Sequence, residues 1–220
     1  MFVGHYAVAF ALKGKEKNTS LGWLFIAVQL VDILFFPLAV LGIESLKFEE
    51  GFTEVNNFKM EFYPFTHGLL GSLIWALLFY VLFKFVIAKN KINSNRVAVI
   101  MAIAVLSHWF ADLLVHTPDL PLINGEPKFG FGLWNYKAIT FFTEAVLLLL
   151  GLWYYLKKTR SITKSGKYAA SIFSVLLILV NYLNMYVLPP NNSVISLTIS
   201  ALFLYFLFAG IAFYVDKKRI

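Results

Sequence analysis

The sequence predicts an all-α membrane protein, a helix bundle with six spanning helices and a short amino-terminal half-helix. Two observations predict this class. Of the 220 residues, 60% are apolar and 14% are charged, and the mean hydropathy is +0.74, whereas a soluble domain carries roughly 45–50% apolar and about 25% charged residues. In addition, six segments reach the length of about 20 mainly apolar residues that a spanning helix needs.

The chain is predicted to form a single membrane domain. Its longest polar stretch, Ile43–Thr66, is too short to build a core of its own. Met1–Leu12 is apolar but about half as long as a span, so we expect a half-span or re-entrant helix there. The spans are predicted at Leu21–Ile43, Gly68–Ile87, Val97–His116, Ala138–Leu156, Ala169–Leu188 and Val194–Val215.

The net charge of +7 does not indicate nucleic-acid binding, because the basic residues stand in short clusters beside the spans. Loops with and without these clusters alternate along the chain, and the positive-inside rule places the basic ones in the cytoplasm. We therefore expect a multi-pass protein of the cytoplasmic membrane with a cytoplasmic carboxyl terminus. The basic clusters are Lys13–Lys17, Lys84–Arg96, Lys157–Lys167 and Lys217–Arg219.

Ionisable residues inside the predicted spans are the most informative feature. A charged group at the centre of a span costs about 2.5–3.5 kcal/mol on insertion scales, so such residues usually have a function. With a rise of about 1.5 Å per residue, they converge on one layer between mid-membrane and the outer surface, and His5 rises about 12 Å from Lys13 to meet them. The set is His5, Asp32, His67, His108, Asp112, His116 and Glu144.

The strongest local pattern is His108-x-x-x-Asp112-x-x-x-His116. Residues four apart share a helix face, so two imidazoles and a carboxylate point the same way. Such a set suits Zn²⁺ or a similar divalent ion. Because the chain has no cysteine, thiolate ligands are excluded, and His67 and His5 complete the predicted set of nitrogen and oxygen ligands.

Other interpretations of these residues stay open. The same cluster could form a metal-free path for protons or ions, or could serve polar packing between helices. Asp119 follows Thr117-Pro118 and fits either the site or a turn. Glu144 fits either a partner of a ligand or an acid near a helix amino terminus.

Several segments resemble known membrane proteins. Gly4-His5, Phe65-Thr66-His67-Gly68-Leu69-Leu70 and Ser107-His108-Trp109-Phe110-Ala111-Asp112 resemble the bacterial inner-membrane metal-dependent hydrolase family (YdjM-like). A group of membrane proteins described as permeases is similar over Gln29–Asp32, Asp112–Leu122 and Gly130–Asn135. The resemblance covers about residues 1–151, and it implies a hydrolase of the bacterial inner membrane. The family's Asp-x-Asp-His pattern is reduced here to Asp32.

The order of the histidines and aspartates is also similar to that of the zinc-dependent phospholipase C and P1 nuclease proteins. This resemblance implies that His67, His108 and Asp112 hold one zinc ion, that Asp112 bridges to a second ion at His5, and that Asp32 lies near the attacking water. A third site in that family uses His-x-x-x-Glu. Here only His116 and Glu144 are present, on separate helices.

These residues predict a membrane-embedded, metal-dependent hydrolase. His5, His67, His108, Asp112 and His116 are the predicted ligands and Asp32 the predicted general base. The depth of the site favours a lipid ester or phosphoester of the outer leaflet as substrate, with its head group under Ile43–Thr66. The alternatives are a cation- or proton-coupled transporter, for which the inner halves of the spans offer almost no ionisable residue, and a non-catalytic scaffold.

Overall fold

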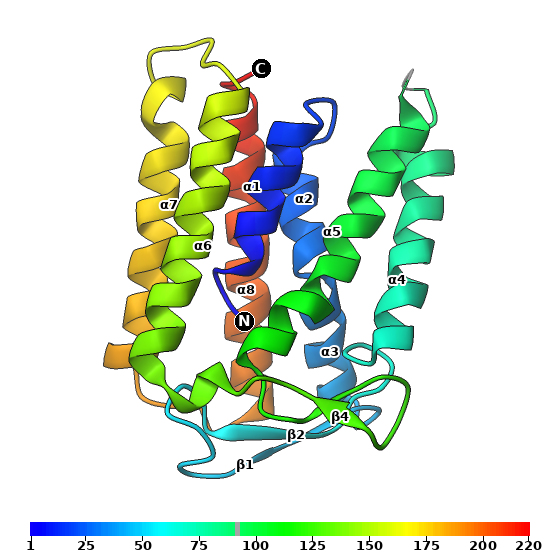
Figure 1. The fold of residues 1–220 in the computed structure, drawn as a ribbon, viewed down its shortest axis with the longest axis vertical. Helices are drawn as coiled ribbons and strands as arrows, with labels where there is room; N and C mark the ends of the chain where they lie inside the picture. Colours follow the sequence, from blue (N-terminus) through cyan, green and yellow to red (C-terminus); the bar gives the residue numbers. More distant parts are fainter. Residues whose placement is uncertain (91–92) are drawn as a thin grey trace.

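The structure, a computed structural model that describes residues 1–90 and 93–220, is the helical membrane bundle that the sequence predicts. Long helices run roughly parallel to one another, and short strands lie across one end of the bundle (Figure 1). The helices within the described residues are α1 (His5–Lys15), α2 (Leu21–Val28), α3 (Leu30–Val40), α4 (Leu69–Leu82), α5 (Ser94–Val115), α6 (Lys137–Lys158), α7 (Gly166–Tyr182) and α8 (Val194–Asp216).

Within the described residues, five helices are long and apolar enough to cross a membrane, or six if the bent pair α2–α3 is counted as one span. Two of these helices end in a π-helical turn, so that α4 extends through Phe83–Ile87 and α7 through Leu183–Val187. The predicted spans agree with these helices to within a few residues. An uninterrupted apolar sequence is enough to place them, because each helix must cover the full apolar layer.

The first span differs from the prediction, because Leu21–Ile43 does not form one continuous helix. It breaks at Gln29, where φ is −108° and ψ is 6°, and the two parts are bent by 48°. The side-chain amide of Gln29 donates to the carbonyl of Phe2 at 3.2 Å. Hydropathy is continuous through this point, so the pattern of apolar residues could not indicate the bend.

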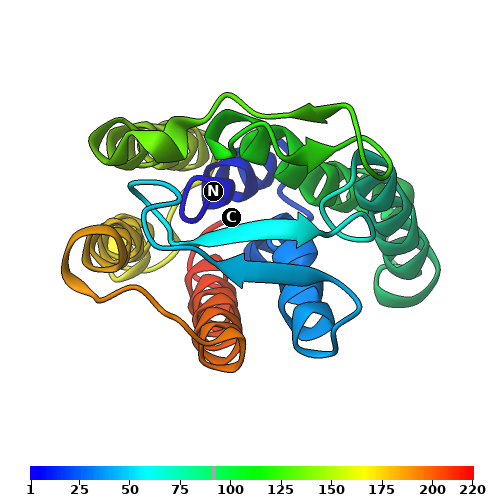
Figure 2. The ribbon, with the colours of Figure 1, turned by 90° about the horizontal axis from the view of Figure 1, so that it is seen from below.

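The predicted half-helix is present as α1, whose eleven residues rise about 16 Å. It begins in the middle of the bundle and lies centrally, enclosed by α6, α5, α2 and α8 (Figure 2). Gly151 of α6 allows the close approach, since a Cβ atom there would meet the carbonyl oxygen of Ala7 at 2.3 Å. The first residue of this helix, His5, therefore lies deep inside the protein.

Two hairpins cover the end of the bundle opposite to the basic loops (Figure 1). The stretch Ile43–Thr66, predicted as a loop, contains an antiparallel pair in which Ser45 faces Phe62 and Phe48 faces Phe58. At the other end, Lys13 is buried and paired with Asp216 at 2.8 Å. Lys91, in the predicted basic cluster Lys84–Arg96, lies outside the described residues. The strands are β1 (Ser45–Phe48), β2 (Phe58–Phe62), β3 (Leu120–Pro121) and β4 (Lys128–Phe129).

The main apolar core fills the half of the bundle nearer to the basic loops. Its centre is aromatic, with Tyr6 stacked on Phe25 at 4.3 Å between ring centroids and Phe25 stacked on Phe173 at 5.4 Å. A smaller cluster around Phe35, Tyr63 and Trp109 packs beneath the first hairpin. The ionisable residues of the spans are gathered between these two clusters.

Candidate metal centre

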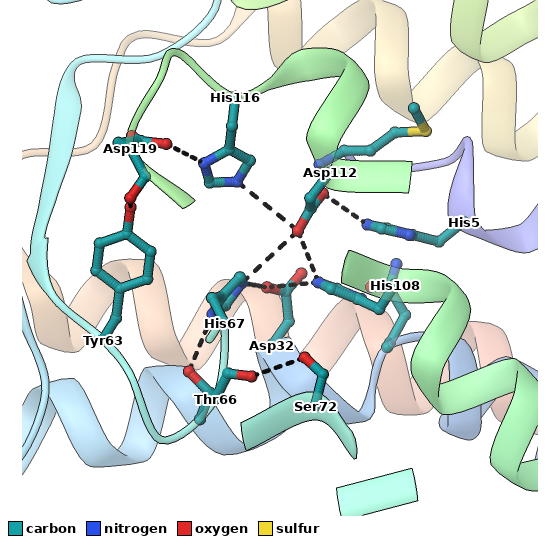
Figure 3. A network of polar contacts seen from close by, with 12 residues as sticks. His5, Asp32, Tyr63, Thr66, His67, Ser72, His108, Asp112, His116 and Asp119 are labelled. Atoms are coloured by element: carbon teal, nitrogen blue, oxygen red, sulfur yellow. Dashed lines mark hydrogen bonds and ion pairs between the residues drawn. The ribbon is translucent and has the colours of Figure 1, made fainter. Parts of the chain in front are cut away.

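All of the predicted ligands lie in one buried group (Figure 3). They come from separate parts of the chain: the start of α1, the segment before α4, and the last two turns and the end of α5. The short length of α1 brings the first of these parts to mid-depth. Each ligand is at most 2% exposed; they are His5, His67, His108, Asp112 and His116.

Asp112 is the centre of the group. Its Oδ2 atom lies 2.9 Å from Nε2 of His108, 3.7 Å from Nε2 of His116 and 3.8 Å from Nε2 of His67. Its Oδ1 atom faces the amino-terminal ammonium group and, at 3.2 Å, Nε2 of His5. The Nε2 atoms of three histidines, two from α5 and one from the segment before α4, therefore lie within 3.8 Å of a single carboxylate oxygen.

The tautomer of His67 follows from its neighbours. The hydroxyl of Thr66 donates to the Glu44 carboxylate at 2.7 Å, so the same oxygen must accept a proton from Nδ1 of His67, 2.9 Å away. Glu44 is fully buried and also accepts from the backbone N–H groups of Phe65 and Thr66, both at 2.9 Å. With a proton on Nδ1, Nε2 is the ligand atom of a neutral His67. Nε2 is hydrogen-bonded to Oδ1 of Asp32 at 3.2 Å and lies 3.8 Å from Oδ2 of Asp112.

His108 and His116 are oriented in the same way by different acceptors. Nδ1 of His108 lies 2.7 Å from the carbonyl of Val28, which is free at the end of α2 because the helix breaks at the next residue. Nδ1 of His116 lies 2.9 Å from Oδ1 of Asp119. A carbonyl and a carboxylate can only accept, so both Nδ1 atoms carry a proton, and in a neutral imidazole Nε2 is then the atom with the lone pair.

The surroundings of His5 indicate whether the group of ligands fits a metal ion. The ring of His5 stacks on that of His108 with centroids 3.9 Å apart. Among the described residues Nδ1 of His5 has no hydrogen-bond partner, while Nε2 of His5 and Nε2 of His108 face the Asp112 carboxylate at 3.2 and 2.9 Å. A buried polar atom without a partner costs about 1–3 kcal/mol, so the unpartnered Nδ1 of His5, beside imidazole nitrogens that face a carboxylate, fits a site that binds an ion. Two overlapping triads have ligand atoms within 4.8 Å of one another: His5, Asp32 and His108, and His67, His108 and Asp112.

Asp32 lies at the side of the group, facing the cavity described below. Its Oδ1 atom is 3.2 Å from Nε2 of His67 and 3.6 Å from Nε2 of His108. Its Oδ2 atom accepts a hydrogen bond from the phenol of Tyr205 on α8 at 2.8 Å. Oδ1 of Asp32 thus faces the ligands, and Oδ2 is held by the hydrogen bond from α8.

Glu144 anchors the amino-terminal segment. Its buried carboxylate accepts from the backbone N–H of Gly4 at 3.0 Å and from that of Phe2 at 3.1 Å. These N–H groups precede α1, so Glu144 lies at the positive end of that helix, next to His5. Of the two predicted interpretations, the geometry is that of an acid at a helix amino terminus.

The end of α5 is held in place by the segment after β4. The N–H of Gly132 donates to the carbonyl of His116 at 2.7 Å, and Trp134 packs on the His116 ring with centroids 4.2 Å apart. Gly130 lies against the same helix end, where a Cβ atom would meet the His116 carbonyl oxygen at 2.4 Å. These contacts fix the direction of the His116 ring.

Asp119 is fixed by the segment before α4. The phenol of Tyr63 donates to the Asp119 carbonyl at 2.5 Å. Burial raises the pKa of the Tyr63 phenol above its usual range, and the neighbouring Asp119 carboxylate adds to the effect. Tyr63 therefore remains a neutral donor, and Asp119 belongs to the site through its contact with His116.

A cavity of about 900 Å³ adjoins the group. His67, Asp112 and His116 line its inner end together with Asp32. Its walls come from the first hairpin, from α3, from α8 and from the segment that joins α7 to α8. These walls include the apolar side chains of Phe35, Phe36, Met60, Met185, Leu197, Ala201 and Leu204.

The roles of several residues of the site are not indicated by the sequence pattern. Thr66 stands beside His67, but Glu44 is far from any ligand in sequence. Tyr205 belongs to a span in which no motif was recognised, although a phenol in an apolar helix is itself a sign of a buried hydrogen bond. The carbonyl of Val28 could not be found at all, because its role depends on the bend at Gln29.

Comparison of the chain with protein-family models, with curated proteins and with solved structures found no match. The geometry of the group therefore carries the functional argument.

Proposed function

We propose that this protein is a membrane-embedded hydrolase that depends on a divalent metal ion, with zinc as the ion that suits the ligands best. The proposed ligands are the Nε2 atoms of His67 and His108 and the carboxylate of Asp112, with His116 and His5 completing the set. A buried site with imidazole and carboxylate donors fits zinc, which takes four such ligands or three and a water. The observation that carries the proposal is the convergence of three oriented Nε2 atoms on one oxygen of Asp112.

The chemistry proposed for the site is hydrolysis. A bound divalent ion supplies Lewis-acid polarisation of the scissile group and makes water more acidic. Asp32 faces the cavity and lies beside His67 and His108, so its carboxylate can take the proton of the attacking water. Tyr205 holds the second oxygen of that carboxylate and thereby sets the direction of the first.

We further propose that the substrate is a lipid ester or phosphoester of the outer leaflet, in the cytoplasmic membrane of a bacterium. The basic loops lie at one end of the bundle and the cavity reaches toward the other, so the positive-inside rule would place the site on the outer side. The loop between β1 and β2, which carries Glu50 and Glu54, lines the cavity where a head group would sit.

A cation- or proton-coupled transporter would need a polar path from the site to the basic end. Between them lie buried apolar side chains such as Phe10, Phe25 and Phe208. Moving a charge through such packing is costly. This packing counts against a polar transport path, and the hydrolase therefore remains the favoured proposal.

The first test is the metal content of the detergent-purified protein, measured by inductively coupled plasma mass spectrometry. We expect close to stoichiometric zinc or manganese in the wild type and in Glu61→Gln, a control that changes an exposed carboxylate on β2. His108→Ala and Asp112→Ala should both lose the metal. A wild-type protein that stays metal-free after incubation with zinc, manganese and cobalt would refute the proposed centre.

The second test is hydrolysis by the metal-loaded protein of a mixture of phospholipids and neutral glycerolipids, followed by lipid mass spectrometry. Asp32→Asn should keep the metal and lose the activity, because the amide cannot accept the proton. Failure of the metal-loaded wild type to cleave any lipid of the mixture would refute the lipid hydrolase while leaving the metal centre intact.

A further inference from the structure

Two neighbouring segments of the bundle form one wall of the cavity beside the metal centre. One is the end of α7 with its π-helical turn, which contributes Asn184 and Met185. The other is α8, which contributes Leu197, Ala201 and Leu204 at the spacing of one helix face. These two segments are both parts of candidate membrane spans.

The same wall reaches the outer surface of the bundle. Ser200 of α8 and Asn184 of the π-helical turn both line the cavity and are exposed. Tyr186 on the same turn and Leu188 just after it line the cavity too and are 43% and 59% exposed. The cavity therefore has an opening between α8 and the end of α7, in addition to the opening under the first hairpin.

The depth of this opening can be worked out from the helix rise. Ser200 lies six residues after the start of α8 at Val194, which is about 9 Å, and Leu204 lies about 15 Å along the helix. A hydrocarbon layer is about 30 Å thick. The opening therefore extends from the end of the bundle to about the middle of the apolar layer, where lipid chains surround the protein.

The cavity changes character from its inner end to this opening. Its inner end carries the ionisable His67, Asp112 and His116, whereas the opening is lined by apolar Leu197, Ala201 and Leu204 and by the uncharged Ser200 and Asn184. A molecule that fits both ends must have a polar group joined to an apolar chain. A lipid that kept its chain in the bilayer while its head reached the metal centre would avoid a large cost, since each methylene group moved into water costs about 0.8 kcal/mol.

We propose that this opening is a lateral portal for one acyl chain of a membrane glycerolipid. The chain lies between α8 and the end of α7, and the ester or phosphoester bond next to it reaches the ligands. This inference rests on the proposed function and specifies its substrate class: a lipid that enters from the bilayer, and not a soluble ester that enters beneath the hairpin.

The experiment uses the full chain in vesicles of phosphatidylethanolamine and phosphatidylglycerol that contain a phospholipid with a photoactivatable diazirine in its acyl chain. Mass spectrometry of the cross-linked peptides should place labels on residues 197–204 and 184–188. Ala201→Trp, which fills the portal, should lower this labelling at least fivefold. Leu207→Trp is the matched control, because Leu207 lies on the same helix, is 43% exposed and does not line the cavity.

A second variant avoids any failure of folding. Because the chain has no cysteine, Ser200→Cys can be modified with a bulky maleimide after the protein has folded. The modification should lower the labelling of residues 184–188 as Ala201→Trp does. In metal-loaded protein, it should also lower hydrolysis of a long-chain lipid at least tenfold and hydrolysis of a short-chain, water-soluble ester less than twofold.

The outcomes separate the portal from the proposed function. Labelling of the two segments that is unchanged by Ala201→Trp and by the modified cysteine would overturn the portal. Equal loss of the soluble and the long-chain substrate would also overturn it, while hydrolysis itself would stand. Labelling that is blocked as expected, in a protein that cleaves no ester, would support the portal and refute the hydrolase.

Discussion

Thr66 offers the sharpest test of how the metal centre is built, because it touches a proposed ligand without binding the ion. Its hydroxyl connects the buried Glu44 carboxylate, at 2.7 Å, to Nδ1 of His67, at 2.9 Å. Thr66→Val keeps the shape of the side chain and removes both contacts. Loss of an outer partner of a ligating histidine typically lowers metal affinity about 10–100-fold, so the zinc dissociation constant should rise by that factor, equivalent to about 1.4–2.8 kcal/mol.

The assay is competition for zinc between the purified protein and a fluorescent chelator of known affinity, in detergent at constant pH. Thr53→Val is the matched control, because the Thr53 hydroxyl makes hydrogen bonds only within the tip of the first hairpin, to Asn56. Thermal unfolding of the metal-free forms measures the stability of each variant separately. A folded Thr66→Val protein that binds zinc within threefold of the wild type would refute the view that Glu44 and Thr66 orient His67.

Four further predictions concern the rest of the site. Tyr205→Phe should keep the metal but lower kcat about tenfold, because Asp32 loses the donor at 2.8 Å; an unchanged kcat would contradict this role. Glu144→Ala should lower the free energy of unfolding by about 2 kcal/mol in thermal melts, because the buried N–H groups of Phe2 and Gly4 lose their acceptor, whereas Glu144→Gln should lose less than half as much. Removal of the metal with a chelator should lower the melting temperature, since an ion present at 100 times its dissociation constant stabilises by about 2.7 kcal/mol. Because the pKa of Tyr63 is raised in the folded protein, the unfolded state loses its proton first as pH rises through about 10, so stability should fall there, and less steeply in Tyr63→Phe.

The helices could be predicted from the sequence because the bilayer imposes one requirement on all of them. Each span must be about 20 residues long and apolar, and each must satisfy its backbone internally. The half-helix was also predictable, because Met1–Leu12 is too short to span and ends at a lysine cluster. The bend at Gln29 and the two hairpins were not, because they depend on contacts between distant segments and leave no trace in hydropathy.

The candidate site could be predicted only in part, for a related reason. Ionisable groups are rare in apolar helices, so the aspartates and histidines stand out in the sequence, and helix rise places them at similar depths. The residues that orient them do not stand out. Glu44 lies in a polar connection that contains other acids, and Tyr205 is one of eleven tyrosines in the chain. Their role is a matter of position, which requires the fold.

The broken backbone at mid-membrane is itself part of the candidate site. Irregular backbone at that depth is tolerated only where protein or a cavity surrounds it, because lipid offers no hydrogen bonds. Here two helix ends meet: α1 begins beside the site, with its preceding N–H groups on Glu144, and α2 ends there at the bend, with the Val28 carbonyl on His108. Each helix end leaves backbone groups without a partner in the helix. The N–H group of Gly4 ties the start of α1 to Glu144, and the Val28 carbonyl holds the ring of His108. A continuous span through residues 21–40 would pair the Val28 carbonyl within its own helix and leave Nδ1 of His108 without this acceptor. The bend thus accounts for the orientation of the most buried ligand.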